Sequence, residues 1–202
     1  SHDGLLQNAL DVVDYLGLTE QDAALALLPF YYSFGNSILL THLLAGAPLV
    51  FGASMMYPEK MLELVDAHGI SGLYGVPSLF QMLLRKRLLS DPRWRALRFV
   101  AQAGGAMPAI VADEIERALP GRSLFVMYGQ TEATARICYL APEFRRLFPD
   151  SVGWPMPDTC IQIRDDAQQL LPCVQVCQVW VRGPCVMLGY WHDHDATDQV
   201  LV

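Results

Sequence analysis

The chain has 202 residues and 52% of them are hydrophobic, which is enough for one large domain with a sizeable buried core. Its formal net charge is −7, from 14 Lys and Arg against 21 Asp and Glu, and it contains no basic stripe. This balance argues against a nucleic-acid partner, because phosphate backbones are bound by clustered Lys and Arg.

Helical and strand patterns alternate along the first part of the chain. Apolar residues at helical spacing predict helices over residues 3–16, 37–46, 58–67, 78–89 and 108–119. Short apolar runs between them predict strands over residues 23–29, 48–52, 70–77, 97–105 and 123–129. Continuous apolar strands separated by amphipathic helices indicate an α/β fold, with a mainly parallel sheet layered by helices.

The apolar stretch over residues 23–53 raises the question of a membrane span. Pro29, Gly35, His42 and Pro48 divide it into pieces, and none reaches the roughly 20 unbroken apolar residues that a spanning helix needs. We therefore predict buried strands and core helices in this stretch and no membrane span.

The pattern changes after about residue 150. Residues 160–165 and 174–183 alternate apolar and polar side chains, with turn residues between them and no long helix. We predict a division into an α/β part, residues 1–150, and the start of a β-rich subdomain, residues 151–202.

Cysteine and histidine provide only weak metal-binding signals. The five cysteines form no CxxC pair, whereas a zinc site needs about four ligands. We interpret them as reduced thiols of a cytoplasmic protein. The run HDHD, residues 192–195, either binds a metal or forms a solvated turn, and we favour the turn.

Unusual residues lie where three of the predicted strands end. These segments are residues 28–35 (LPFYYSFG), 101–108 (AQAGGAMP) and 127–134 (MYGQTEAT). In open parallel sheets, ligands bind at the carboxyl ends of strands, where loops converge. Gly104 and Gly105 leave room for a flat ring or an acyl chain against their backbone, or serve only as a structural turn.

The segment after the last of these strands holds Tyr128, Thr131 and Glu132 close together. A tyrosine ring can stack on a base, a threonine hydroxyl can donate to a phosphoryl oxygen, and a carboxylate can hold Mg²⁺. Thr131 followed by Glu132 is equally typical of a helix cap. These residues alone leave both interpretations open.

Five segments occur in an order that resembles the adenylate-forming superfamily of acyl-CoA synthetases, AMP ligases, adenylation domains and luciferases. They are LPFYYSFG, AGGAMP, YGQTEAT, VGWPMP and VWVRGPCVMLGYW. The resemblance implies an enzyme that forms an acyl-adenylate from a small carboxylic acid and MgATP. The acyl group would then pass to a thiol, either of coenzyme A or of the phosphopantetheine on an acyl carrier protein.

The resemblance also implies roles for particular residues. Thr131 would bond a phosphoryl oxygen and Glu132 would bind the magnesium ion, with residues 1–150 as the nucleotide- and acyl-binding subdomain. The nucleotide pocket would be lined by Ala103, Gly104, Gly105, Ala106, Tyr128 and Gly129.

The implied walls of the acyl pocket are Tyr32, Phe34, Val76 and Met127. Tyr32 stands where many family members carry a His that gates this pocket, so closure is retained while imidazole chemistry is lost. The other three are also interpretable as simple core residues.

The chain departs from the family pattern in two ways. The family's phosphate loop, Thr-Gly-Asp segment and mobile C-terminal domain fall outside these 202 residues, which predicts a core fragment that is inactive in isolation. Val174 and Cys177 replace two glycines, and Gln178 an acid, of the usual Leu-Pro-x-Gly-x-x-Gly-Glu. If those positions need positive φ, each replacement costs on the order of 1 kcal/mol. The alternative is a catalytically inactive adenylation-like domain retained for ligand or partner binding.

Overall fold

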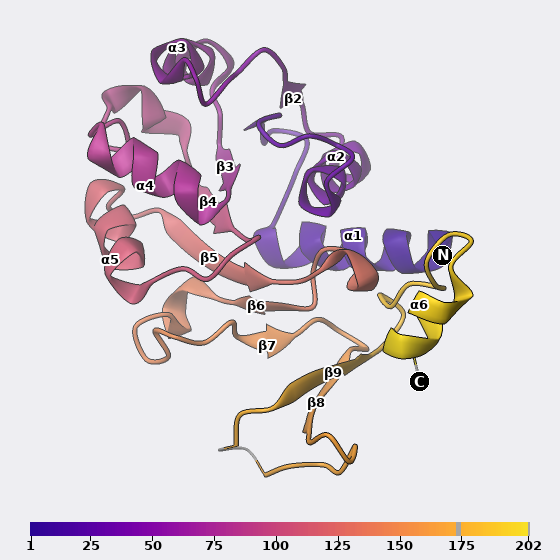
Figure 1. Cartoon of the computed structure of the whole chain (residues 1–202). Coiled ribbons are helices and arrows are strands. Elements are labelled where there is room, and N and C mark those ends of the chain that lie inside the picture. Colours follow the sequence, from indigo (N-terminus) through magenta and orange to yellow (C-terminus); the bar gives the residue numbers. More distant parts are fainter. Residues whose placement is uncertain (173–174, 202) are drawn as a thin grey trace.

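A seven-stranded sheet forms the centre of the protein, whose computed structural model describes residues 1–172 and 175–201. Its strand order is β2-β1-β3-β4-β5-β6-β7 (Figure 1). The parallel strands are β1 (Ala24–Leu25), β2 (Leu49–Val50), β3 (Gly72–Gly75), β4 (Phe99–Gln102) and β5 (Ser123–Tyr128). The antiparallel strands β6 (Cys138–Leu140) and β7 (Trp154–Pro155) complete the sheet. The predicted α/β class with a mainly parallel sheet is confirmed.

Helices cover both faces of this sheet (Figure 1). One face packs against α3 (Pro58–His68), α4 (Pro77–Arg85) and α5 (Ala109–Ala118). The other face packs against α1 (His2–Leu16) and α2 (Ser33–Ala45). Short 3₁₀ turns follow at η1 (Pro92–Ala96), η2 (Thr131–Ala133) and η3 (Pro142–Phe144). Covering on both faces explains why the strands are apolar without interruption.

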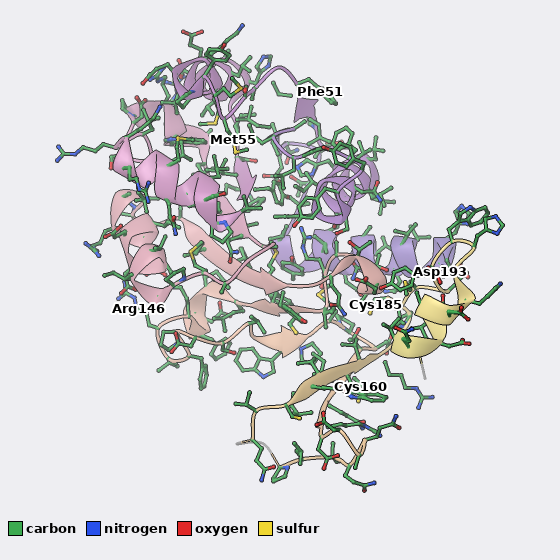
Figure 2. The ribbon with its side chains drawn as sticks, in the orientation of Figure 1. Phe51, Met55, Arg146, Cys160, Cys185 and Asp193 are labelled. Carbon is green, nitrogen blue, oxygen red and sulfur yellow. The ribbon has the colours of Figure 1, made fainter. Side chains whose placement is uncertain are left out.

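A separate two-stranded antiparallel sheet, β8 (Cys160–Arg164) and β9 (Gln178–Arg182), confirms the β-rich character after residue 150. The division near that residue stays a prediction, and the large sheet extends to β7. Cys160 is exposed on the small sheet, whereas Cys185 is buried (Figure 2). Val174 lies outside the described residues, but Cys177 has no positive φ, so no left-handed strain arises there.

The HDHD run, predicted to form a solvated turn, is exposed and turns at His192 before it enters a short helix. Asp193 caps the short helix α6 (His194–Val200), and its carboxylate accepts a hydrogen bond from the Ala196 backbone N–H at 2.9 Å. The run is therefore a turn joined to a helix N-terminus, because an Asp before a polar helical segment satisfies one of the free N–H groups.

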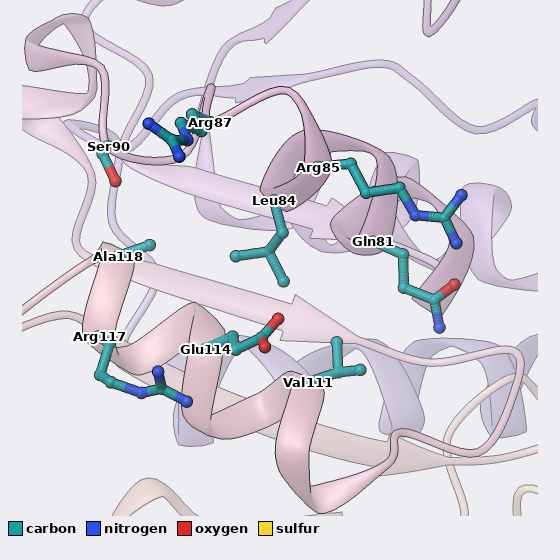
Figure 3. A pocket seen from close by; sticks show the side chains of 9 residues that line it. All are labelled: Gln81, Leu84, Arg85, Arg87, Ser90, Val111, Glu114, Arg117 and Ala118. Carbon is teal, nitrogen blue, oxygen red and sulfur yellow. The ribbon is translucent and has the colours of Figure 1, made fainter.

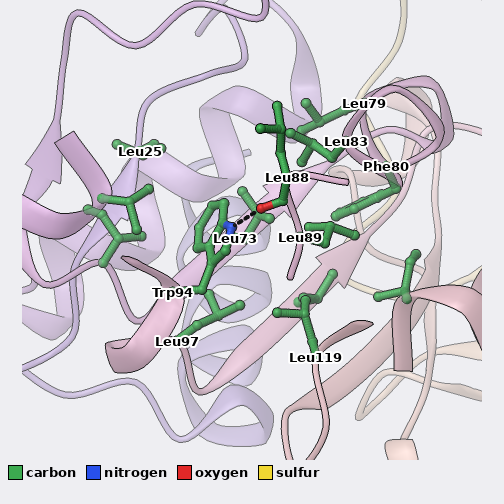
Figure 4. Close-up of a cluster of buried hydrophobic side chains, with 14 of the residues drawn as sticks. Leu25, Leu73, Leu79, Phe80, Leu83, Leu88, Leu89, Trp94, Leu97 and Leu119 are labelled. Atoms are coloured by element: carbon green, nitrogen blue, oxygen red, sulfur yellow. Dashed lines mark hydrogen bonds between the residues drawn. The ribbon is translucent and has the colours of Figure 1, made fainter. Parts of the chain in front are cut away.

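The outer surfaces of α4 and α5 border a groove that is lined by Arg85, Arg87, Glu114 and Arg117, among others (Figure 3). Beneath it lies the largest of three core clusters among the described residues, built from α3, α4, η1 and α5 against one face of the sheet (Figure 4). Its one polar group is satisfied, because the indole N–H of Trp94 donates to the Leu88 carbonyl at 2.9 Å. No helix within residues 1–172 and 175–201 has the length and apolar character needed to cross a membrane.

Helix α2 begins at Ser33, four residues before the predicted start at residue 37. Phe34 and Gly35 look like loop residues in the sequence, yet both are helical. A Cβ at Gly35 would lie 2.2 Å from the Pro29 carbonyl oxygen, so only glycine allows the first turn of α2 to pack on that loop.

Helix α4 ends at Arg85, whereas the prediction carried it to residue 89. Arg87 adopts a left-handed backbone with φ of 56°, and the Leu88 N–H then donates to the Leu83 carbonyl at 2.8 Å. The chain turns because Leu88 and Leu89 are needed in the core, where both are buried.

Candidate functional site

The twin-glycine turn leaves the sheet at the carboxyl end of β4. Gln102 pairs with Val126 of β5, so Ala103 leaves the sheet beside Met127, which is still in β5 and pairs with Tyr139 of β6. The buried Gln102 side chain donates from Nε2 to the Gly105 carbonyl at 2.7 Å and holds the turn in place. Ala103 is buried, and residues 104–106 are exposed. Helix α5 begins just beyond, and a helix N-terminus favours an anion.

Three of the predicted site residues meet at Gly104. Its φ is 82°, and a Cβ built there would lie 2.5 Å from the Tyr32 hydroxyl and 3.2 Å from Cγ1 of Val76. Because an L side chain is strained at this φ and would also displace Tyr32, the position needs glycine. Tyr32 thus stands against the turn, and its role in closing a pocket there stays a prediction.

The loop after β5 is tightly folded on itself. A Cβ at Gly129 would lie 2.0 Å from the Ala135 carbonyl oxygen, so the loop's own backbone fills that space. Thr131 is not a helix cap, because Gln130 occupies the cap position of η2 and makes no side-chain capping bond. The Thr131 hydroxyl instead donates to Oγ of Ser33, the first residue of α2, at 3.4 Å.

Residues 32 and 33 therefore join the two turns. The Tyr32 hydroxyl occupies the space where a side chain at Gly104 would lie, and the neighbouring Ser33 is hydrogen-bonded to Thr131. Both residues lie where α2 begins, so the N-terminus of this helix, which favours an anion, opens at the same place. The structure brings together a glycine turn, two hydroxyls and the N-terminus of α2 at the edge where the parallel strands end.

Glu132 is held by the C-terminal segment. One carboxylate oxygen, Oε1, accepts a hydrogen bond from the Tyr190 hydroxyl at 2.5 Å, and its backbone carbonyl accepts from the Met187 N–H at 2.8 Å. The bond to the carboxylate raises the pKa of Tyr190 above its ordinary value. Tyr190 was not predicted as a site residue, although it belongs to the quoted segment VWVRGPCVMLGYW.

The residues present fit a magnesium ion of the kind that binds through nucleotide phosphates. Such an ion takes one or two protein carboxylates and keeps several waters. Glu132 supplies a carboxylate, and the Thr131 hydroxyl, bonded to Ser33, belongs to the preceding residue of the same turn. Within the described part of the chain, no group of three or more His, Cys, Asp or Glu side chains gathers where it could hold a metal ion on its own.

Two of the predicted acyl-pocket residues are packed in the second core cluster. Phe34 and Met127 are each 2% exposed. The Phe34 ring makes edge contacts with Tyr32 at 6.5 Å and Tyr74 at 6.4 Å between centroids. Sδ of Met127 accepts from the Tyr15 hydroxyl at 2.9 Å. Tyr128, predicted to border the adenine, is half-buried at the end of β5.

Sequence reasoning missed Arg136, which is 0% exposed. Thr134 and Ala135 both adopt left-handed backbone, with φ of 54° and 64°, and they reverse the chain after η2. Arg136 then enters the interior, where its guanidinium lies 4.4 Å from the centroid of the Phe34 ring. A lone charge inside the apolar run ARICYL was the signal that could have identified it.

The Arg136 guanidinium is a cation without an anion. Among the described residues, none accepts a hydrogen bond from its Nε, Nη1 or Nη2 at bonding distance. The neighbouring Tyr15 hydroxyl supplies no anion, because burial raises the pKa of Tyr15 by more than the charge of Arg136 lowers it. An unpaired buried charge costs several kcal/mol, whereas a desolvated cation–π contact contributes only about 2 kcal/mol. The other fully buried arginine, Arg145, is fully paired by contrast, with Asp113 at 2.6 Å and with Glu116.

The comparisons with known proteins identify the family of this chain. The model of the AMP-binding enzyme family matches residues 1–191. The long-chain-fatty-acid–CoA ligase of Yersinia pestis is 32% identical over 185 residues, which cover 90% of this chain and 32% of that protein. The chain spans about a third of the length of the curated relatives it matches.

Two solved structures are similar over 98% of this chain. The crystal structure of VinN has a TM-score of 0.86 at 31% identity, and the match covers 49% of that chain. The O-succinylbenzoate coenzyme A synthetase MenE of Bacillus subtilis, solved with ATP and magnesium ion, has a TM-score of 0.85 at 26% identity, covering 40% of that chain.

Proposed function

Because the chain belongs to the AMP-binding enzyme family, we propose that it is the acid-activating core of a ligase that makes an acyl-adenylate. The single observation that carries this is the junction at residues 32–33. Tyr32 packs against Gly104 while Ser33 bonds Thr131, so the glycine turn and the threonine–glutamate turn face one site. The site lies at the carboxyl ends of parallel strands, where such sheets bind ligands.

The proposed reaction has two steps. A carboxylate oxygen of the acid attacks the α-phosphorus of ATP, the bond to the β-phosphate oxygen breaks, and pyrophosphate leaves. The sulfur of a thiol then attacks the acyl carbon, AMP leaves with the carboxyl oxygen, and the thiol proton passes to solvent. Both steps concentrate negative charge, so donors that stand ready at the phosphate are the main catalytic requirement.

Each site residue has a defined task in this proposal. The Thr131 hydroxyl donates to a phosphoryl oxygen, and the N-terminus of α2, whose first residue Ser33 bonds Thr131, favours the same anion. Glu132, oriented by Tyr190, would hold the magnesium ion, which would neutralise phosphate charge. Tyr32 closes the acyl side against water, and residues 103–106 with Tyr128 and Gly129 border the nucleotide.

We infer coenzyme A as the thiol acceptor, with a carrier protein as the alternative. The inference is supported by curated relatives named as CoA ligases for long-chain fatty acids and for 2-succinylbenzoate. The rival hypothesis of an inactive binding domain receives no support from Cys177, which carries no left-handed strain.

The test is acid-dependent exchange of pyrophosphate into ATP, measured on the full-length protein that contains these residues. Glu132→Gln should reduce exchange by about 100-fold or more, because a neutral amide is a poor magnesium ligand. Glu63→Gln is the matched control, since Glu63 is exposed on α3 away from the strand ends. Equal exchange in the two variants would remove the metal assignment, and no exchange with any acid would favour the inactive domain.

A further inference from the structure

Among the residues that the structure describes near the candidate site, Arg136 carries a buried charge that the proposed reaction does not use. It is 0% exposed, and no described residue accepts from its guanidinium nitrogens. The sharp reversal at residues 134–135 that carries it inward follows directly on the turn with Thr131 and Glu132. Two consecutive residues with left-handed backbone are strained, and strained backbone is found most often at ligand sites.

Arg136 stands on the acyl side of the site. Its guanidinium lies over the Phe34 ring, and Phe34 contacts Tyr32, which in turn stands against Gly104. The two rings therefore form a continuous aromatic path between the twin-glycine turn and the buried cation. An acid whose reacting carboxylate lies at Gly104 would direct the rest of its chain along this path.

We propose that Arg136 binds a second carboxylate on the acid substrate, so that the site selects dicarboxylic acids over monocarboxylic acids. The proposal rests on the proposed function, because it assigns the substrate class of the same site. Guanidinium and carboxylate match as a planar, two-point pair, which adds geometric selection to charge.

The surroundings of Arg136 suit an incoming anion. The hydroxyl of Tyr74 is also buried and has no partner among the described residues. Burial raises the pKa of Tyr74 well above its ordinary value, and the positive charge of Arg136 acts against that rise. Tyr74 is thus a neutral donor within the field of the guanidinium. A carboxylate that displaces the Phe34 ring from its place over Arg136 would meet both groups.

The experiment measures pyrophosphate exchange by the full-length protein with straight-chain diacids and with monoacids of equal carbon number. We expect the best diacid to exceed its matched monoacid by about 100-fold or more in kcat/KM, since a site built to bond a polar group rejects analogues that lack it. Arg136→Met should abolish this preference, and Arg136→Lys should restore part of it. If Arg136 had a purely structural role, Arg136→Met would lower kcat/KM equally for diacids and monoacids. Equal kcat/KM with both classes in the unaltered protein would overturn the proposal.

Calorimetric binding without ATP separates this proposal from the proposed function. If no acid supports exchange, the proposed function fails, yet the chain should still bind the diacid and lose that binding in Arg136→Met. Binding of diacid and monoacid with equal affinity, or equal binding of inorganic phosphate, overturns the assignment of Arg136. Circular dichroism of both variants establishes that they are folded.

Discussion

Replacing Arg136 by methionine should make the ligand-free protein more stable, which is the opposite of what most buried substitutions do. Exchanging a buried charge for an apolar side chain of similar volume stabilises by about 1–4 kcal/mol. The variant also loses the contact with the Phe34 ring, worth up to about 2 kcal/mol. We therefore expect a net gain of about 1–2 kcal/mol, or a rise in Tm of about 2–8 °C for a chain of this size.

Arg145→Met is the matched control, because Arg145 is equally buried but paired with Asp113 and Glu116. Removing one partner of a buried ion pair costs about 3–5 kcal/mol. Asp113 is 52% exposed and Glu116 is 19% exposed, so water would partly solvate the stranded carboxylates. We expect a loss of about 1–3 kcal/mol.

Thermal and urea unfolding of the two variants would measure both changes. The same substitution at two buried arginines should move the midpoint in opposite directions. A loss of stability in Arg136→Met comparable to that of Arg145→Met would show that the guanidinium has an anionic partner in the ligand-free protein, and the inference from its unpaired state would be refuted.

Three further predictions concern the site and its support. Gly104→Ala should destabilise the protein by about 1 kcal/mol or more through backbone strain. Adding Tyr32→Phe should recover only the part of this loss that comes from the 2.5 Å contact with the Tyr32 hydroxyl oxygen. Thermal melts of the single and double variants would measure both effects. The pKa of Tyr190 is raised chiefly by its bond to Glu132, so ultraviolet titration of Glu132→Gln should show this tyrosine ionising at lower pH than in the unaltered protein; an unchanged titration would contradict the bond. Burial opposes ionisation of Asp22, but its bonds from guanidinium, hydroxyl and backbone donors lower its pKa below 3.8. Asp22→Asn should therefore lower the free energy of unfolding by about 2 kcal/mol at pH 7, where Asp22 is charged in both the folded and the unfolded states. This loss should shrink as the pH falls below 3.8, because the carboxylate is then protonated. A loss that does not change with pH would contradict this assignment.

Local pattern determined much of the fold. Continuous apolar strands between amphipathic helices indicated a parallel sheet covered on both faces, because the spacing of apolar residues along an element shows which of its faces are buried. The prediction failed at element ends, where packing decides. Gly35 lies in α2 because the Pro29 carbonyl leaves no room for a side chain, and α4 stops at Arg85 because Leu88 must reach the core.

The sequence by itself determined the fold class and the order of the residues with suitable chemistry at the strand ends. Only the tertiary structure decided how those residues meet. Thr131 reaches Ser33 across 98 positions and Glu132 reaches Tyr190 across 58, and such contacts depend on strand register rather than on neighbours in the chain. The unpaired burial of Arg136 is likewise invisible in its own segment, because a charge is buried or exposed according to what other elements place around it.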